Sequence, residues 1–264
     1  MKTICIVGKG YVGAAMENLL KDHYNITIKE IDDSYDIVNQ SDVAIVCVPT
    51  NKKEDGTCDT SIVEEVIKES NAPIYLIKSA IPPKTTEYLK LKYNKRIVVS
   101  PEYIGEGKYF VPYWKGIPHP TDMRMHDFQI FGGDREDTQI MVDLFIKILG
   151  PYCRFFQTDS RTAELVKYME NSYLAMKVVF HHEYSRIVKL FDRDYREVRE
   201  LFLADRRTDR GSSATFDDNN LGFGGKCLPK DISAIYQAAK ENGFDSKLFK
   251  QIMETNEDLK KSNG

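Results

Sequence analysis

The chain of 264 residues is poor in the features that mark secreted, metal-binding and nucleic-acid-binding proteins. Its five cysteines show no CxxC spacing and no even framework, which argues against a zinc site or a disulfide scaffold and fits a reducing cytosol. The net charge is only −3, so neither nucleic acid nor an anionic membrane is an obvious partner. The longest apolar runs, such as residues 43–48, are too short to span a bilayer, and no signal peptide precedes the apolar run at residues 2–7. We therefore expect a cytoplasmic enzyme of two compact domains that binds no metal.

A glycine motif follows the first apolar run. Residues 2–7 predict a buried strand, the next six residues read Gly-Lys-Gly-Tyr-Val-Gly, and residues 14–21 predict a helix. This is the GxGxxG pattern in the strand, turn and helix context that dinucleotide binding requires. The glycines allow a tight turn, admit a pyrophosphate to the helix N-terminus and let the helix pack closely on the strand. The predicted cofactor-binding residues of this motif are Gly8, Gly10, Tyr11, Val12 and Gly13.

An acidic residue follows at the place where such sites bind ribose. Residues 25–31 predict a second strand, which places Glu30 near the position that accepts the ribose hydroxyls of NAD. Asp32 and Asp33 lie beside it and would repel the 2′-phosphate of NADP. The sequence therefore predicts NAD as the cofactor.

Strands and helices alternate along the first 100 residues. We expect a strand ending in a loop over residues 41–50, strands at 73–79 and 96–100, and helices at 59–70 and 84–93. This alternation predicts an α/β fold, a Rossmann-type doubly wound parallel sheet with helices on both faces over residues 1–158. A long helical stretch follows, so we expect an all-helical central domain over residues 159–264. Ligands bind beyond the carboxyl ends of such strands, where three loops lie, at residues 48–50, 79–83 and 100–107.

The stretch from Gly222 to Asp231 combines glycines, a cysteine, a lysine and a carboxylate within ten residues. Glycines let a backbone approach a ligand closely, and a thiol near Lys230 can be held partly as thiolate, the form that attacks carbonyls. The pattern predicts covalent catalysis at Cys227. The alternative for such a cysteine is a buried small residue in a tight turn.

Two polar residues of the long helical stretch lie one turn apart. Lys167 and Asn171 are four residues apart and so share one helix face, where they form either an oxyanion-binding pair or a solvated polar stripe. Further along, His181 and His182 lack metal-ligand spacing to Asp, Glu or Cys, and we expect them to be packing or surface residues.

These motifs, in their order and spacing, resemble those of the UDP-glucose and GDP-mannose dehydrogenases, the four-electron nucleotide-sugar 6-dehydrogenases. The resemblance extends from the first strand to about Glu257. It implies that a nucleotide sugar is the substrate and that the first two loops flank NAD. The residues that the resemblance assigns to the cofactor are Pro49, Thr50, Ser79 and Lys230. Those that it assigns to the substrate are Tyr103, Gly224, Gly225 and Arg210, the last reaching the sugar from a neighbouring subunit.

The family's chemistry implies a role for each catalytic residue. The sugar alcohol is oxidised to an aldehyde, Cys227 adds to it, and the thiohemiacetal is oxidised to a thioester that water hydrolyses to a carboxylate. Lys167 and Asn171 would stabilise oxyanions, and Asp231 would orient a lysine or water. Glu102 and Glu106 would activate water. The family pairs through its long central helix, so we expect a homodimer to which Leu165, Leu174, Val178 and Ile187 contribute packing.

Four departures from the family pattern leave other functions open. Ala80 stands where the family has a threonine, and Gly105 stands where it has an arginine. The segment between residues 31 and 41 is also shorter than the corresponding segment of the family. The sequence also ends at Gly264, where the family continues into a second Rossmann-like domain. The alternatives are a two-domain hydroxyacid-type dehydrogenase and a non-catalytic NAD-binding module or fragment of a longer enzyme. In residues 108–119, Trp114 and its aromatic neighbours would either stack on a nucleobase or form a small hydrophobic cluster.

Overall fold

The computed structural model describes residues 1–104, 122–208 and 221–262. These residues form two compact units. The first contains residues 1–53, 58–104 and 122–167, and the second contains residues 54–57, 168–208 and 221–262. Several residues singled out from the sequence lie outside the described ranges, namely Gly105, Glu106, Arg210 and the aromatic loop at 108–119 with Trp114.

The first unit is built on one sheet with the strand order β2-β1-β3-β4-β5-β6-β7. Its strands are β1 (Thr3–Val7), β2 (Asn25–Lys29), β3 (Val43–Val46), β4 (Tyr75–Ile77), β5 (Ile97–Val99), β6 (Phe128–Gly132) and β7 (Arg154–Thr158). Neighbouring strands are parallel except at the junction of β5 and β6, where Val99 pairs with Gly132 in the antiparallel sense. The expected Rossmann-type parallel sheet is confirmed, with one antiparallel junction, between β5 and β6.

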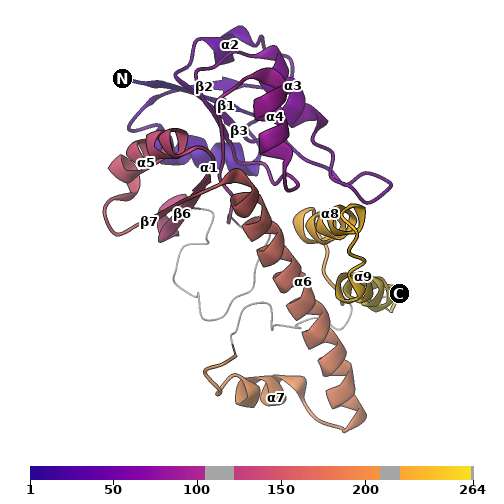
Figure 1. The fold of residues 1–264 in the computed structure, drawn as a ribbon. Helices are drawn as coiled ribbons and strands as arrows, with labels where there is room; N and C mark the ends of the chain where they lie inside the picture. Colours follow the sequence, from indigo (N-terminus) through magenta and orange to yellow (C-terminus); the bar gives the residue numbers. More distant parts are fainter. Residues whose placement is uncertain (105–121, 209–220, 263–264) are drawn as a thin grey trace. The chain divides into compact units, whose positions relative to one another are not determined.

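Helices cover both faces of this sheet (Figure 1). They are α1 (Tyr11–Leu20), α2 (Asp36–Asn39), α3 (Ser61–Glu69), α4 (Thr85–Tyr93) and α5 (Arg135–Leu149). Alternate residues of each strand point to opposite faces, so Ile4 and Ile6 of β1 pack with α1 and α5, while Cys5 and Val7 pack with α2, α3 and α4.

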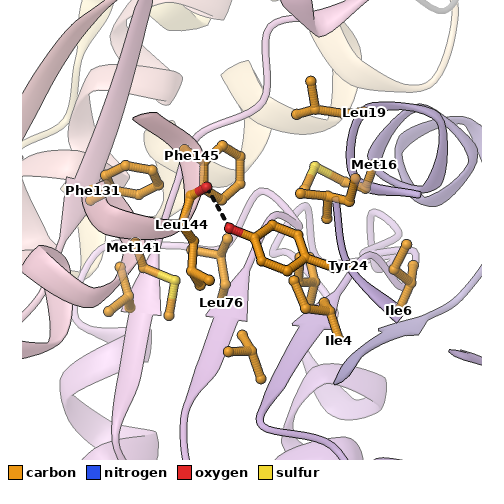
Figure 2. Close-up of a cluster of buried hydrophobic side chains, with 14 of the residues drawn as sticks. Ile4, Ile6, Met16, Leu19, Tyr24, Leu76, Phe131, Met141, Leu144 and Phe145 are labelled. Carbon is orange, nitrogen blue, oxygen red and sulfur yellow. Dashed lines mark hydrogen bonds between the residues drawn. The ribbon is translucent and has the colours of Figure 1, made fainter. Parts of the chain in front are cut away.

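The core on the α1 and α5 face is a continuous apolar layer. Figure 2 shows Met16 of α1 and Phe145 of α5 gathered over Ile4 of the sheet. Tyr24 lies among them, and its hydroxyl donates to the backbone oxygen of Leu144 at 2.9 Å, which satisfies the one polar atom that this tyrosine brings into the core. This packing ties α1, and therefore the turn before it, to the sheet.

The second unit consists of helices and loops in the part of the chain that the structure describes. Its helices are α6 (Ser160–Leu190), α7 (Tyr195–Phe202), α8 (Cys227–Glu241) and α9 (Lys247–Lys261). Helix α6 begins in the first unit and continues into the second, because the two units part between residues 167 and 168. The core of the second unit joins Val179 of α6, Ile232 of α8 and Ile252 of α9. The expected helical domain after the sheet is confirmed.

Among residues 1–104, 122–208 and 221–262, none of the helices is long and apolar enough to cross a membrane.

Candidate functional site

The strand order places the N-terminal glycine motif at the point where ligands bind in this class of sheet. Strand β1 has β2 on one side and β3 on the other. The helix after β1 packs on one face of the sheet and the helix after β3 packs on the opposite face. The chain therefore leaves the carboxyl ends of β1 and β3 in opposite directions, which defines the topological switch point of a doubly wound sheet.

The three glycines of the motif are required for different reasons. Gly8 has φ +87°, and a Cβ there would lie 3.2 Å from the backbone oxygen of Cys47 on the neighbouring strand segment. A Cβ at Gly13 would overlap the backbone oxygen of Gly8, so this glycine lets α1 pack against the turn. A Cβ at Gly10 would have no atom of the residues that the structure describes within 4 Å, and its φ is −75°. The folded chain itself therefore does not require glycine at position 10, whereas a ligand approaching the N-terminus of α1 would.

Glu30 lies against this glycine turn. Strand β2 ends at Lys29, two residues earlier than expected, so Glu30 is the first residue beyond it. Its Oε1 accepts from the backbone N–H of Lys9 at 2.7 Å, and its own N–H donates to Asp33 at 2.8 Å. The acid and the glycines are thus adjacent, as the ribose and pyrophosphate of one dinucleotide would require.

The first two loops predicted to flank the cofactor are joined to each other by hydroxyl groups. Ser79 Oγ donates to the backbone oxygen of Val48 at 2.6 Å, and Thr50 Oγ1 donates to that of Ala80 at 2.9 Å. Pro49 is exposed between them. These hydrogen bonds hold the loops after β3 and β4 together as one surface at the carboxyl edge of the sheet.

Glu102, in the third loop, is a largely buried carboxylate held by an ion pair and by two N–H donors. Its Oε2 forms an ion pair with Lys78 Nζ at 3.1 Å, and its Oε1 accepts from the N–H groups of Tyr103 at 2.7 Å and Ile104 at 3.0 Å. Burial raises the pKa of Glu102, but the charge on Lys78 and the two N–H donors together lower it below its ordinary value. Glu102 is therefore held ionised.

Lys78 was not predicted from the sequence. It ends an apolar strand segment and is 2% exposed, and its ammonium also donates to Ser100 Oγ at 3.1 Å. A lysine at the carboxyl end of a buried strand was the available signal, because a buried ammonium requires a partner nearby.

Lys167 of α6 lies over the ring of Tyr103, with Nζ 4.7 Å from the ring centroid.

The second unit holds the cysteine and its glycines. Cys227 is exposed and is the first residue of α8. The interpretation of Cys227 as a buried residue in a tight turn is therefore wrong. Gly224 and Gly225 are also exposed, and a Cβ on either would have no atom of the described residues within 4 Å. The described part of the chain thus leaves space beside the thiol at both glycines.

A buried polar triad lies in the same unit. Asp231 is 1% exposed, accepts from Asn171 Nδ2 at 2.5 Å and forms an ion pair with its neighbour Lys230. Asn171 is buried, so the interpretation of a solvated stripe is wrong for this residue. Asp231 orients both the amide and the ammonium. His181 and His182 are buried and hydrogen-bonded, as packing residues are, and no group of three or more potential metal ligands occurs among the described residues.

Comparison with known proteins places these observations in a family. The UDP-glucose/GDP-mannose dehydrogenase family matches twice, its NAD binding domain over residues 16–115 and its central domain over residues 161–258. The sequence is 30% identical to a UDP-glucose 6-dehydrogenase of Campylobacter jejuni, over 93% of this chain and 59% of that protein. It is 27% identical to that of Rickettsia bellii, over 84% of this chain and 50% of that protein. The chain thus spans about half the length of the curated relatives it matches.

Solved structures share the fold. A UDP-glucose dehydrogenase from Pyrobaculum islandicum is similar with a TM-score of 0.81 and 22% identity, over 97% of this chain and 68% of that chain. A 3-hydroxyisobutyrate dehydrogenase from Mycobacterium tuberculosis is similar with a TM-score of 0.69 and 15% identity, over 96% of this chain and 92% of that chain. At these identities the likeness concerns the fold alone.

Proposed function

Because this chain belongs to the UDP-glucose/GDP-mannose dehydrogenase family and carries its NAD binding domain, we propose that it oxidises a nucleotide sugar to the uronate, as in UDP-glucose to UDP-glucuronate. The observation that carries the proposal is the exposed Cys227 at the start of α8, with open glycines before it and the buried Asn171–Asp231 pair in the same unit. We place the reaction in the cytoplasm, because none of the five cysteines forms a disulfide.

The first unit supplies the residues that would hold NAD. The open position at Gly10 and the N-terminus of α1 suit the pyrophosphate, and Glu30 suits the ribose hydroxyls. Tyr11, Val12 and Gly13 begin the helix, and Pro49, Thr50 and Ser79 form the adjoining loops. Lys230 completes the proposed cofactor set from the second unit. When bound, NAD accepts the hydride that each oxidation releases.

Cys227 divides the four-electron oxidation into two two-electron steps. The primary alcohol loses a hydride and a proton to give an aldehyde, and the Cys227 sulfur adds to the aldehyde carbon. The carbon–sulfur bond persists while the thiohemiacetal loses a second hydride and a proton to become a thioester. Water then breaks that bond and releases the carboxylate and the thiol. The positive end of the α8 dipole favours negative charge at the sulfur.

The other assigned residues act on charge and on water. Asn171 is oriented by Asp231, and we assign it and Lys167 to stabilising the oxyanions that form on the reacting carbon. Glu102, held ionised by Lys78, is assigned to activating the water, with Glu106 as its companion. Gly224, Gly225 and Tyr103 are assigned to the substrate, together with Arg210 from a second subunit.

The experiment that tests this proposal counts reduced cofactor against product. Incubation with NAD and UDP-glucose or GDP-mannose should give two NADH for each carboxylate formed. Cys227→Ser should abolish acid formation while NAD binding persists, because the cofactor residues lie chiefly in the first unit. Cys153→Ser, at a buried cysteine outside the proposed site, is the matched control and should remain active.

Two other outcomes would replace the proposal. One NADH per oxidised product with a simple hydroxyacid, unaffected by Cys227→Ser, would identify a two-domain hydroxyacid-type dehydrogenase, whose two-electron chemistry needs no thiol. NAD binding without turnover of any of these substrates would favour the non-catalytic module.

A homodimer through α6 is part of the proposal. Half of the expected positions, Leu165 and Ile187, lie on an exposed apolar stripe that also contains Met169, Tyr173, Phe180 and Tyr184. Val178, by contrast, packs against the core of the second unit. The spacing places the stripe on one helix face, which a second copy of the helix would cover. Light scattering should give twice the chain mass, and Phe180→Glu should give the mass of one chain. A single-chain mass for the unaltered protein would rule the dimer out.

A further inference from the structure

The segment that leads into Cys227 is anchored in the core of the second unit. Leu221 and Phe223 are 8% and 4% exposed and belong to the apolar cluster between α6, α8 and α9. Gly222 lies between them with φ +85°, and a Cβ there would lie 2.7 Å from Asn256 Oδ1. The backbone must therefore turn tightly against α9 two residues before the open glycines at 224 and 225.

Two buried side chains bind the backbone of this segment. The N–H of Gly222 donates to His182 Nδ1 at 2.6 Å. The N–H of Phe223 donates to Asn256 Oδ1 at 2.6 Å, and Asn256 Nδ2 donates back to the oxygen of Phe223 at 3.2 Å. His182 is 6% exposed and Asn256 is 2% exposed. Three hydrogen bonds, two of them buried and one part-buried, thus hold two consecutive residues to helices α6 and α9.

The bond to Gly222 requires neutral His182. An imidazole nitrogen accepts a hydrogen bond only when it carries no proton, so Nδ1 is unprotonated and the ring proton lies on Nε2. Burial, and next the charge of Arg186 on α6, lower the pKa of His182 and so favour this neutral form. From α9, Lys260 lies beside Gly222 and pairs with Glu257 at 3.1 Å. The anchored residues Leu221 and Phe223 carry no charge.

We propose that His182 is a positioning residue for the proposed reaction: with Asn256 it holds residues 221–223 and so directs Gly224, Gly225 and Cys227 toward the substrate, and it releases Gly222 when protonated. The proposal rests on the proposed function for its catalytic meaning. The hydrogen bond between Gly222 and His182, and its loss when His182 is protonated, can be measured without turnover.

Amide hydrogen exchange on the full chain tests the anchor. After correction for intrinsic rates, His182→Ala should raise the exchange rate of the Gly222 amide at least tenfold. His182→Asn should retain most of the protection, because its amide oxygen can accept the same bond. His181→Ala is the matched control, since His181 is equally buried but bonds to the Tyr195 hydroxyl instead. It should leave the Gly222 amide protected.

The dependence on pH supplies a second, separate test. In the unaltered protein the Gly222 amide should lose protection as pH falls through the lowered pKa of His182, whereas in His182→Asn it should not. The same two proteins should differ in kcat at low pH with similar KM values for NAD. Equal protection in His182→Ala and the unaltered protein would overturn the proposal, and so would identical pH profiles for the unaltered protein and His182→Asn. If the unaltered protein forms no uronate, the proposed function fails, while the exchange rates still decide whether the anchor exists.

Discussion

The glycine turn at residues 8–13 of the first unit and the turn at Gly222 of the second unit are constrained by different kinds of contact. At Gly8 and Gly13 the constraints are contacts between backbone atoms within the turn itself and the adjoining strand. At Gly222 the constraints are the side chains of His182 and Asn256, which belong to two different helices. Close backbone contacts therefore fix the first turn. The second turn depends on hydrogen bonds with side chains, so a change in a single side chain can remove one of them.

The two units also hold their buried carboxylates differently. Glu102 is neutralised by Lys78, from a neighbouring strand, and by two N–H groups of its own loop. Asp231 forms an ion pair with Lys230, the residue before it, and accepts a hydrogen bond from the amide of Asn171 on another helix. In both cases several donors converge on a carboxylate that is largely withdrawn from water.

The largest effect is expected from removing the lysine of the first unit. Lys78→Met should lower the free energy of unfolding by about 3–5 kcal/mol, because it leaves Glu102 buried without its countercharge. Without Lys78 the pKa of Glu102 should rise, so the stability that its ionised form contributes at neutral pH should be lost. Urea unfolding measures this, with Lys90→Met at the more exposed Lys90–Asp134 pair as a control expected to cost less than about 1 kcal/mol. Equal costs at the two positions would contradict the role given to Lys78.

Between pH 4.5 and about 7, the pH dependence of the two units should run in opposite directions. Burial raises the pKa of Glu164 from 4.5 to about 7, even though it accepts from Thr86 and from the N–H of Lys84. Its contribution to stability is therefore present below its unfolded pKa and is lost as pH rises through about 7, by up to about 3 kcal/mol. His182, with a lowered pKa, should destabilise the second unit as pH falls.

Amide hydrogen-exchange rates measured from acid to neutral pH would show how the stability of each unit depends on pH. In Glu164→Gln the decline near neutral pH should disappear from the first unit, and the behaviour of the second unit should be unchanged. A decline that persists in Glu164→Gln would show that another group causes it.

Substituting alanine at two glycines of the same turn distinguishes a glycine that the fold needs from one that only a ligand needs. Gly13→Ala should cost about 1–3 kcal/mol, because a Cβ there meets backbone that cannot move away. Gly10→Ala should change stability by less than about 0.5 kcal/mol and yet weaken NAD binding, since only the ligand needs that space. The matching pair in the second unit is Gly222→Ala and Gly224→Ala. We expect Gly222→Ala to lower the free energy of unfolding and Gly224→Ala to weaken only substrate binding. Unfolding curves and cofactor titrations test both pairs, and a stable Gly13→Ala would refute the steric argument.

The smallest expected effect concerns cofactor choice. Glu30→Ala should weaken NAD binding about tenfold and reduce the preference for NAD over NADP, because a charged acceptor for the ribose hydroxyls is removed. Glu17→Ala is the control, since Glu17 is another carboxylate near the turn, paired with Lys9 Nζ at 2.8 Å. Fluorescence titration with both cofactors measures the ratio. Equal affinities for NAD and NADP in the unaltered protein would contradict the assignment of Glu30.

Much of the first unit was predictable because its determinants are close together in the chain. The strand, turn and helix around Gly8–Gly13 follow from apolar residues and glycines within about one strand and one helix, and Glu30 follows one strand later. Strand β6, which pairs with β5 in the antiparallel sense, was not predicted, because the two strands are separated by residues 100–127 in the chain.

The amino-acid sequence by itself determined most of the order of strands and helices over the first 100 residues, the glycine turn and the presence of a cysteine beside glycines, because periodicity and turn chemistry act between near neighbours. Only the tertiary structure decided which groups neutralise Glu102 and which hold the second turn. The partners there are separated by 40 residues for His182 and Gly222 and by 33 for Asn256 and Phe223. Such pairs form because apolar packing brings whole helices together, and buried polar groups then bond to whatever donor or acceptor that packing places within reach.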